Sequence, residues 1–411
     1  MLLKVASASL ISRKLTVTLT TLAIAVSVFV MLGVEHIRSE ARQSFSKTVS
    51  GVDLIIGART GPVNLLLYSV FHIGSASNNI SWHSYQTLAK HPLVSWHIPL
   101  SLGDSHKGYR VLGTSKNYFK YFKYGQKQSL TFAQGQAFDH DFDAVIGAEI
   151  ADKLGYQLND EIKISHGVAA ISFHHHDNKP FKITGILKAT GTPVDQTVHV
   201  NLQAIENIHQ DTPDTDSSHH DSHDHANDIK VTPDFITAFM VGLKSKAATF
   251  VVQQQVNNFS DEALLAIIPG VALTELWQMM NTVEKTLALI SALVVIASLL
   301  GMITLLLASM KERMHEIAVL RAIGAHASFI FLLIELEALL ITSLGILLGI
   351  ILLNGTLLAS QSWISSHYGL FIDANIFDTT LLTYSAGILM VAAFLALAPA
   401  LLAYRHSRQI T

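Results

Sequence analysis

Hydrophobic and polar positions divide the chain into long uninterrupted apolar runs and one long mixed region. A helix that crosses a membrane needs about 20 mostly apolar residues, because lipid cannot satisfy its backbone amides. Four segments meet this condition: Leu15–Leu32, Leu287–Met310, Ile330–Leu353 and Leu381–Ala403. The pattern therefore predicts a membrane α-helical fold, with four transmembrane helices and a large extracytoplasmic domain between helices 1 and 2.

The first apolar run also has the basic flank of a secretory signal peptide, because Lys4, Arg13 and Lys14 precede it. The run is longer than the apolar core of a usual signal peptide. No clear small-residue cleavage site follows before Glu35 and His36. We therefore predict that this segment is an uncleaved membrane span.

The region between the first two spans alternates short β-rich runs with helical patterns, which predicts an α+β domain. Glycine, aspartate and asparagine bound many of these runs. The predicted strands are Val52–Ile56, Tyr109–Leu112, Glu161–Ser165 and Phe181–Leu187, and the predicted helices are Trp82–Lys90, Glu149–Leu154 and Ala247–Asn258.

The segment Thr274–Lys285 carries apolar residues at helical spacing and leads straight into the second span. These residues are Leu276, Trp277, Met280 and Val283. A rigid stalk that joins the outer domain to the membrane fits this pattern. An amphipathic helix on the lipid surface, anchored by Trp277, fits it equally well.

Composition excludes several classes of protein. Only 14% of residues are charged, against a typical value of about 25%, and the formal net charge is −3. A nucleic-acid binder held by phosphate contacts is therefore not expected. The absence of cysteine excludes disulfides and thiolate metal sites. No phosphate-binding loop, His-Glu-x-x-His helix or Gly-x-Ser-x-Gly elbow occurs in the sequence, so we predict that the chain itself is not an enzyme.

Basic residues in short loops predict the orientation of the spans, because lysine and arginine are retained in the cytoplasm. The loop between spans three and four has no lysine or arginine from Ser360 to Thr379. The N-terminus, the loop after span two and the C-terminal tail carry Lys4, Arg13, Lys14, Lys311, Arg313, Arg321, Arg405 and Arg408. We therefore predict that both termini are cytoplasmic and that the large domain lies on the opposite side.

Histidine is unusually frequent, with 21 residues, and most of them lie in the predicted outer domain. Imidazole and carboxylate groups are ligands for divalent ions such as zinc. The candidate ligands form two clusters: His174, His175 and His176, then His219, His220, His223 and His225 with Asp221 and Asp224. The second cluster lies in the segment Asp211–Asp228, which has too little apolar content to fold alone. A solvated low-complexity loop explains the same composition, and both interpretations stay open.

The loop between spans two and three predicts a short helix with mixed charge that ends near Gly324. Its apolar positions are Ile317, Leu320 and Ile323, and its oriented charges are Arg313, Glu316 and Arg321. Such a helix could dock in a groove of a cytoplasmic partner. A helix on the membrane surface, whose basic residues only set topology, is the alternative.

At this loop the chain resembles a known family, the permease subunits of MacB-like, LolC/LolE-like and FtsX-like ATP-binding-cassette (ABC) systems. The most specific match is the pattern Glu-Arg-x-x-Glu-Ile-x-x-Leu-Arg-Ala-x-Gly-Ala at Glu312–Ala325. Further matches are Glu337–Leu340, Pro399–Ala400 with Arg405, and Val52–Ala58 after the first span. The resemblance covers the whole chain.

The resemblance implies a permease half of a bacterial inner-membrane complex, with its large domain in the periplasm. It implies a second permease subunit, expected to be another copy, and cytoplasmic ABC ATPases that bind ATP. It assigns ATPase coupling to Glu312, Arg313, Glu316, Ile317, Leu320, Arg321 and Gly324. Unlike MacB, the chain lacks a fused nucleotide-binding domain, so the ATPase must be a separate protein.

The predicted domain organisation follows from the spans and the resemblance. It comprises residues 1–34 (cytoplasmic N-terminus and first span), 35–273 (periplasmic MacB-like α+β domain with histidine-rich loops), 274–285 (stalk) and 286–411 (FtsX-like three-helix membrane domain with coupling helix 312–324).

The expected function is that of an ABC transporter permease, with a link to zinc or another divalent metal suggested by the histidines. A periplasmic binding or adaptor protein would be a further partner. Export or extraction of a peptide, drug or lipoprotein is the main alternative, and FtsX-like regulation of a periplasmic hydrolase is another. A metal-sensing membrane receptor would be a function of a different class.

Overall fold

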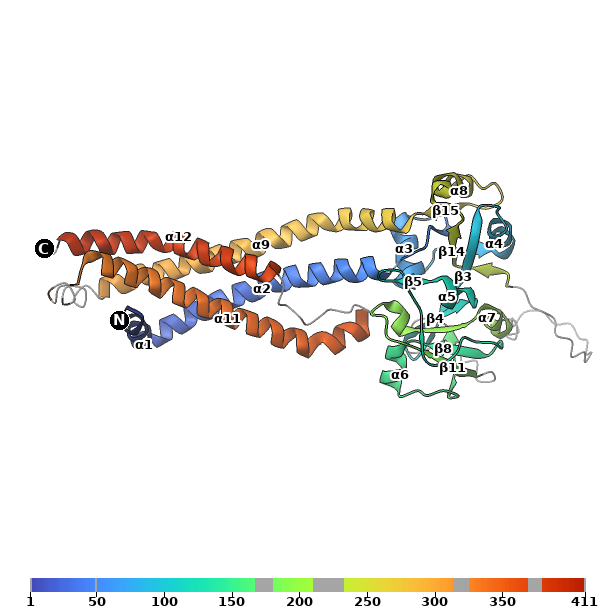
Figure 1. Cartoon of the computed structure of the whole chain (residues 1–411), viewed down its shortest axis with the longest axis horizontal. Coiled ribbons are helices and arrows are strands. Elements are labelled where there is room, and N and C mark those ends of the chain that lie inside the picture. Colours follow the sequence, from blue (N-terminus) through green and yellow to red (C-terminus); the bar gives the residue numbers. More distant parts are fainter. Residues whose placement is uncertain are drawn as a thin grey trace, which may run out of the picture. The chain divides into compact units, whose positions relative to one another are not determined.

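The computed structural model describes residues 2–48, 50–166, 180–209, 233–312, 319, 322, 325–368 and 379–409. The chain divides into two compact units, each described here by itself. The membrane unit consists of residues 1–41, 280–364 and 372–411, and the external unit of residues 42–279 and 365–371. Figure 1 shows the long helices and the β-rich part of the chain.

The described part of the membrane unit is built from helices. These are α1 (Leu2–Ser12), α2 (Lys14–Thr48), α9 (Pro269–Glu312), α11 (Ala327–Tyr368) and α12 (Thr379–Gln409). Segments of α2, α9, α11 and α12 are long and apolar enough to cross a membrane, which confirms the four predicted spans. Each helix extends beyond its apolar run. Pro399 lies inside α12, so the last span does not end there.

Helices α2 and α11 approach each other closely at two glycines of α11. A Cβ atom added at Gly345 would lie 2.6 Å from Cγ2 of Ile24, and one added at Gly349 would lie 2.8 Å from the carbonyl oxygen of Ala25. Only glycine permits this backbone approach, as in other small-residue contacts between membrane helices. The glycine pair therefore fixes where α11 packs on α2.

The external unit is organised around a mixed sheet with eleven strands among the described residues. The strand order is β15 (Leu264–Ile267), β1 (Leu54–Ala58), β14 (Ala238–Leu243), β3 (Val94–His106), β4 (Tyr109–Thr114), β12 (Thr197–Asn201), β8 (Asp143–Ile146), β11 (Phe181–Leu187) and β7 (Phe132–Gly135). Two short strands lie outside this order. Strand β10 (Ser165–His166) pairs with β3, and strand β9 (Glu161–Ile162) pairs with β11. The pairs β12–β4 and β11–β8 are parallel.

Two small two-stranded sheets and short helices surround this sheet. The small sheets pair β13 (Phe235–Ile236) with β2 (Ile80–Ser81) and β5 (Lys123–Tyr124) with β6 (Gln128–Ser129). The helices are α3 (Pro62–Val70), α4 (Trp82–Ala89), α5 (Asn117–Tyr121), α6 (Ala148–Leu154), α7 (Leu202–His209) and α8 (Thr249–Asn257), with the 3-10 helices η1 (Pro193–Gln196) and η2 (Lys246–Ala248).

Strand β3 pairs with different neighbours along its length. Its first part pairs with β14 as far as Leu100, and from Ser101 it pairs with β4. The β3–β4 register shifts between Leu102 and Ser105, which marks a bulge or irregularity. Lys107 and Gly108 then turn the chain into β4 with positive φ angles of 47° and 86°, as a tight hairpin requires.

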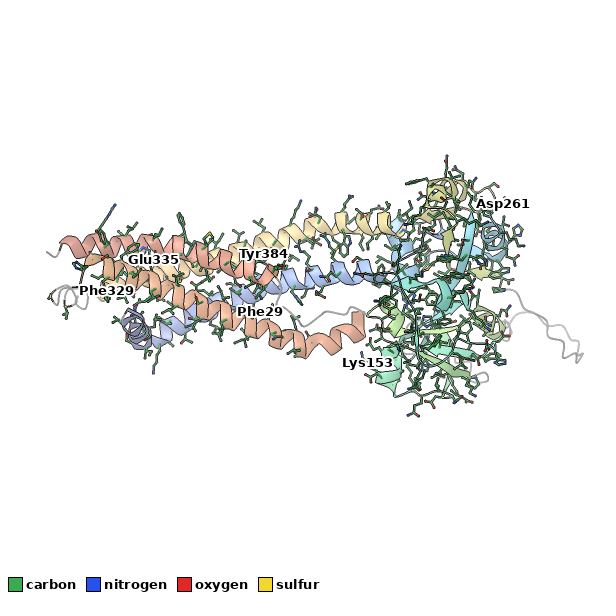
Figure 2. All side chains as sticks on the ribbon, in the orientation of Figure 1. Phe29, Lys153, Asp261, Phe329, Glu335 and Tyr384 are labelled. Atoms are coloured by element: carbon green, nitrogen blue, oxygen red, sulfur yellow. The ribbon has the colours of Figure 1, made fainter. Side chains whose placement is uncertain are left out.

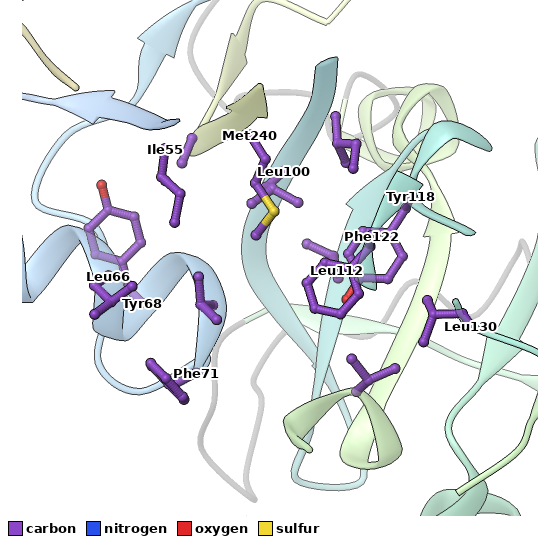
Figure 3. Close-up of a cluster of buried hydrophobic side chains, with 14 of the residues drawn as sticks. Ile55, Leu66, Tyr68, Phe71, Leu100, Leu112, Tyr118, Phe122, Leu130 and Met240 are labelled. Carbon is purple, nitrogen blue, oxygen red and sulfur yellow. The ribbon is translucent and has the colours of Figure 1, made fainter. Parts of the chain in front are cut away.

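The largest core of the external unit lies where α3 and α5 cover the sheet (Figure 3). Leu66 and Tyr68 of α3, Leu100 of β3, and Tyr118 and Phe122 near α5 are almost completely buried. The rings of Tyr118 and Phe122 stack with centroids 4.8 Å apart. Burial of these apolar surfaces is the main favourable contribution to folding of this unit.

The fold class is as predicted, and most predicted elements are present. The strand expected at Phe181–Leu187 is β11, and the helix expected at Trp82–Lys90 is α4. The strand expected at Glu161–Ser165 is instead divided into β9 and β10. The sequence reading missed the long strand β3, because Pro99 and Gly103 are unusual inside a central strand.

Candidate functional site

The predicted ATPase-coupling residues lie at the junction between α9 and α11. Glu312 is the last residue of α9, and α11 begins at Ala327. The other assigned residues lie outside the described residues: Arg313, Glu316, Ile317, Leu320, Arg321 and Gly324. The coupling assignment therefore stays a prediction from the sequence.

The predicted metal ligands also lie outside the described residues. They are His174, His175, His176, His219, His220, His223, His225, Asp221 and Asp224. Within the described ranges, no group of three or more His, Asp or Glu residues has a geometry that could hold a metal ion. The zinc assignment therefore also stays a prediction.

A buried polar site joins the N-terminal helix α1 to α11 in the membrane unit. Glu337 is 1% exposed and accepts a hydrogen bond of 2.5 Å from the Ser9 hydroxyl. The Arg13 guanidinium lies 3.4 Å from its other carboxylate oxygen. Arg13 occupies the turn between α1 and α2, and this turn sets its position. This contact places Glu337 in the interface between α1 and α11.

Glu335, labelled in Figure 2, lies two residues earlier in α11. It is 9% exposed, and its Oε1 atom has no hydrogen-bond partner among the described residues. Two residues in a helix are about 200° apart, so the two carboxyl groups face different neighbours. Ser9 and Arg13 are far from Glu337 in the sequence, so no local pattern could identify them as its partners.

An apolar cavity of about 360 Å³ lies among α2, α9 and α12 in the membrane unit. Met31 of α2, Val295 and Ile296 of α9, and Tyr384 and Ile388 of α12 line it. Its lining is suited to hydrocarbon, which agrees with the membrane character of these helices.

An ion pair joins α2 to α9 in the membrane unit. The Arg38 guanidinium lies 2.5 Å from the carboxylate of Glu35 on its own helix and 3.5 Å from that of Glu284 on α9. One arginine therefore bridges the two helices beyond the apolar part of the first span.

A second contact between α2 and α9 lies in the external unit and is aromatic. The ring of Trp277 on α9 packs edge-on against Phe45 on α2, with centroids 5.7 Å apart. The Arg42 guanidinium lies 5.3 Å from the centre of the Trp277 ring, a cation–π distance. Phe45 also packs on Phe71, at the C-terminal end of α3, with centroids 4.4 Å apart. Trp277 therefore packs against protein at this point.

Two histidines of the external unit have little access to solvent: His72, which follows α3, and His199 on β12. His72 follows Phe71 with φ of 55°, and its Nδ1 atom lies 3.0 Å from the Thr197 hydroxyl. His199 is fully buried, with Nδ1 3.3 Å from the carbonyl oxygen of Val145. Burial lowers the pKa of His72 to about 4 and that of His199 to about 3. Both side chains are therefore neutral at neutral pH and act as structural groups.

Family models account for both parts of the chain. The MacB-like periplasmic core domain matches residues 16–259, and the FtsX-like permease C-terminal domain matches residues 288–408. No curated protein matches the sequence significantly.

Two solved structures are similar to the external part of the chain. The periplasmic region of MacB from Actinobacillus actinomycetemcomitans is 11% identical, with a TM-score of 0.34 over 55% of this chain and 94% of that one. The extracellular domain of the noncanonic ABC-type transporter YknZ from Gram-positive bacteria is 12% identical, with a TM-score of 0.31 over 53% of this chain and 98% of that one.

The two family models together span both the external and the membrane parts, and the first alone covers more than half of the sequence. Four apolar helices and a mixed α+β unit agree with that architecture. This multi-pass membrane protein with an extracytoplasmic domain therefore belongs to the MacB/FtsX-like family of ABC transporter permeases.

Proposed function

We propose that this chain couples ATP hydrolysis by a separate cytoplasmic ABC ATPase to conformational change in the periplasm, and thereby to substrate transport. The observation that carries this proposal is the continuity of α9 from Pro269 to Glu312. Ala272 of this helix is buried in the core of the external unit, and Leu299 is buried in the core of the membrane unit. The helix then ends where the predicted coupling segment begins.

A continuous helix is suited to transmit movement because its backbone hydrogen bonds resist bending. Contacts between α2 and α9 at Arg38–Glu284 and at Phe45–Trp277 support a paired stalk. A displacement at Glu312 would therefore act on the external unit through α9, with α2 as its partner.

The proposed arrangement places both termini in the cytoplasm and the external unit in the periplasm of a bacterial inner membrane. The basic residues of the short loops support this orientation. Four spans are too few to enclose a symmetric transport path, so we expect a second permease subunit, most simply another copy. A periplasmic binding or adaptor protein would complete the complex.

Copurification from the native membrane tests the ATPase partnership. We expect an ABC ATPase to copurify with the wild-type chain and to be lost with Glu316→Arg in the coupling segment. Glu275→Arg is the matched control, because Glu275 is an exposed glutamate of α9 far along the chain from that segment. Unchanged copurification with Glu316→Arg would contradict the proposal. A signalling effector in place of an ATPase would favour the receptor alternative.

The histidine clusters support a second component of the proposal, a link to zinc or another divalent metal. Isothermal titration of zinc into the whole protein, beside a variant that lacks residues 174–176 and 219–225, measures this link. Micromolar binding that disappears in the variant would support metal handling. Weak or unchanged binding would leave a permease for another cargo, with export or extraction of a peptide, drug or lipoprotein, or regulation of a periplasmic hydrolase, as its role.

A further inference from the structure

The apolar cavity among α2, α9 and α12 has the dimensions of one lipid chain. Its volume is about 360 Å³, and its lining on α12 extends from Thr383 to Val391, about 12 Å at 1.5 Å per residue. One leaflet contributes about 15 Å of hydrocarbon, half of the bilayer core. A methylene group occupies about as much space as a water molecule in the liquid, roughly 30 Å³, so the cavity has room for about twelve methylene groups. One acyl chain therefore fits in it.

The cavity is open to the surface of the membrane unit. Ile296 and Val391 line it and are 44% and 43% exposed, whereas Val295 is only 6% exposed. The hydroxyl groups of its lining belong to Thr383 and Tyr384, in the first turns of α12. An acyl chain could therefore enter from the side, with its polar end toward the start of α12.

Charged side chains of α2 lie beyond this polar end. Glu35 and Arg38 follow the lining residue Met31 by one and two helical turns, so the three side chains share one face of α2. Arg38 lies roughly 10 Å along the helix from Met31. It is also within electrostatic range of Tyr384, which is labelled in Figure 2. Since the interfacial layer of a bilayer is about 5–8 Å thick on each side, these charges lie at the depth of a lipid headgroup.

Helix α9 brings a second cation to the same end. Lys285 precedes the lining residue Ala292 by two helical turns and shares its face. Its neighbour Glu284 lies 3.5 Å from Arg38, so α9 and α2 meet at this point. Lys285 is exposed and has no ion-pair partner among the described residues of the chain. Its ammonium group is therefore available to an anion.

The four charges at this end balance each other. Arg38 is shared by Glu35 and Glu284, which leaves one negative charge, and Lys285 supplies one positive charge. Glu35 uses Oε1 for Arg38, so its Oε2 atom remains for a further donor. The polar end of the cavity thus combines one cationic and one anionic site.

The other charged residues of α2 near this end are directed elsewhere. His36 and Glu40 lie about 140° and 180° around the helix from Met31. Arg42 lies over the ring of Trp277 in the external unit. On α12, the described residues before Arg405 carry no charge. These groups therefore leave the balance at the cavity unchanged.

We propose that this cavity binds one phospholipid with an ethanolamine headgroup, from the leaflet next to the external unit. One acyl chain fills the cavity, the phosphate lies beside Lys285, and the ammonium group lies beside Glu35. The shape of the cavity and the paired charges at its end carry this inference. It goes beyond the proposed function, because binding requires neither ATP nor an ATPase.

The headgroup follows from hydrogen bonding as well as from charge. An ethanolamine headgroup carries a phosphate and an ammonium group with three N–H donors, and charge-assisted hydrogen bonds to carboxylates are strong. A choline headgroup has the same charges but no N–H donor, and a glycerol headgroup has no cation. These two lipids therefore separate hydrogen bonding from charge.

Native mass spectrometry of the full-length, delipidated protein tests the proposal by titration with dioleoyl lipids that carry ethanolamine, choline or glycerol headgroups. We expect one ethanolamine lipid per chain, bound several-fold more tightly than either of the other two. All three lipids compete with the same detergent, so their order of affinity reports the headgroup.

Two pairs of substitutions locate the lipid. Gly387 lines the cavity, and a Cβ atom there meets nothing within 4 Å, so Gly387→Leu should fill the cavity and weaken binding at least tenfold. Gly301→Leu on α9 is the matched control, because Gly301 is equally free of contacts and lies outside the cavity lining. Lys285→Gln should weaken binding several-fold, whereas Lys14→Gln, at an exposed position of α2 beyond its other end, should not. An unchanged melting temperature shows that each variant is folded, and Lys285→Gln changes only a surface group.

Several outcomes would overturn the proposal. Failure to bind the ethanolamine lipid would do so, as would equal affinity for the three headgroups. An equal loss with Gly301→Leu and Gly387→Leu would place the lipid elsewhere. If Gly387→Leu instead dissociates an oligomer and leaves lipid binding unchanged, a second copy of the chain covers the cavity and the proposal is wrong.

Discussion

Glu337 and Glu284 are both paired with an arginine, but they differ in their access to solvent. The side chains of Glu337 and Arg13 are 1% and 18% exposed, whereas those of Glu284 and Arg38 are 11% and 39% exposed. Removal of one partner from a buried pair leaves the other charge uncompensated, which costs far more than loss of an exposed pair. The first pair is therefore a structural link between α1 and α11.

We predict that Glu337→Gln lowers the free energy of unfolding by about 3 kcal/mol. The matched change Glu284→Gln should cost less than about 1 kcal/mol, because Arg38 is 39% exposed and keeps its closer partner Glu35. Unfolding of both variants by sodium dodecyl sulfate in mixed micelles measures the difference. Equal losses would show that Arg13 finds another partner or reaches water when Glu337 is changed.

The buried histidines predict acid sensitivity of the external unit. The pKa values of His72 and His199 in the folded protein are about 4 and about 3, below the ordinary value of 6.5. Between pH 6.5 and the folded-state pKa of each histidine, the unfolded chain binds more protons than the folded protein. The contribution of these histidines to the free energy of unfolding is therefore fully present above pH 6.5 and falls as the pH drops toward 4 and 3.

His199→Phe should therefore make the thermal midpoint of the external unit less dependent on pH between 6.5 and 4. Exposed His83 provides the control, and His83→Phe should keep the wild-type slope. Thermal unfolding followed by circular dichroism at several pH values measures the slopes. An unaltered slope in His199→Phe would assign the acid sensitivity to other groups.

Contacts between residues that are far apart in the sequence could not be predicted from the sequence. The sequence places Glu335 and Glu337 near the start of the third apolar run but does not show that they are buried. The partner of Glu337 is 324 positions away, and no periodicity records such a contact. The coupling residues are different, because their local pattern at Glu312–Ala325 carries the family resemblance by itself.

Among the helices, the contact between α2 and α11 depends on the absence of side chains. Gly345 and Gly349 lie against Ile24 and Val28 of α2 at distances that a Cβ atom could not occupy without movement. Larger residues there would separate the helices and remove dispersion contacts along the interface.

Gly345→Leu should consequently destabilise the membrane unit by about 1–3 kcal/mol. Gly355→Leu in the same helix is the control, because a Cβ atom there meets nothing within 4 Å and should be tolerated. Thermal stability of the two variants in the same detergent separates packing from any general effect of leucine. Comparable losses at both positions would indicate that α11 does not pack on α2 through Gly345.

Elements with a clear local pattern were predictable, whereas elements defined by long-range pairing were not. Strand β11 is a short run rich in β-forming residues, and its limits followed from the sequence. Strand β3 contains Pro99, which has no N–H group and which normally excludes a central strand. The fold accommodates it where the pairing passes from β14 to β4, a feature that only the register reveals.

At the scale of the whole molecule, the proposed orientation can be tested directly because the protein contains no cysteine. Gln254→Cys places a thiol at an exposed position of α8, and His326→Cys places one just before α11. A membrane-impermeant maleimide should label the first variant in intact spheroplasts and the second only after the membrane is opened. Labelling of His326→Cys in intact spheroplasts would reverse the proposed topology.

Strand β1, near the start of the external unit, pairs with β14 on one side and β15 on the other, near the end of that unit. During synthesis, the β1 segment therefore cannot pair with β14 or β15 until most of the unit has been made. Contacts so distant in sequence slow folding and leave strand edges exposed in the meantime. A chain interrupted before Leu264 would lack β15 and would leave β1 as an unpaired edge strand, which favours aggregation.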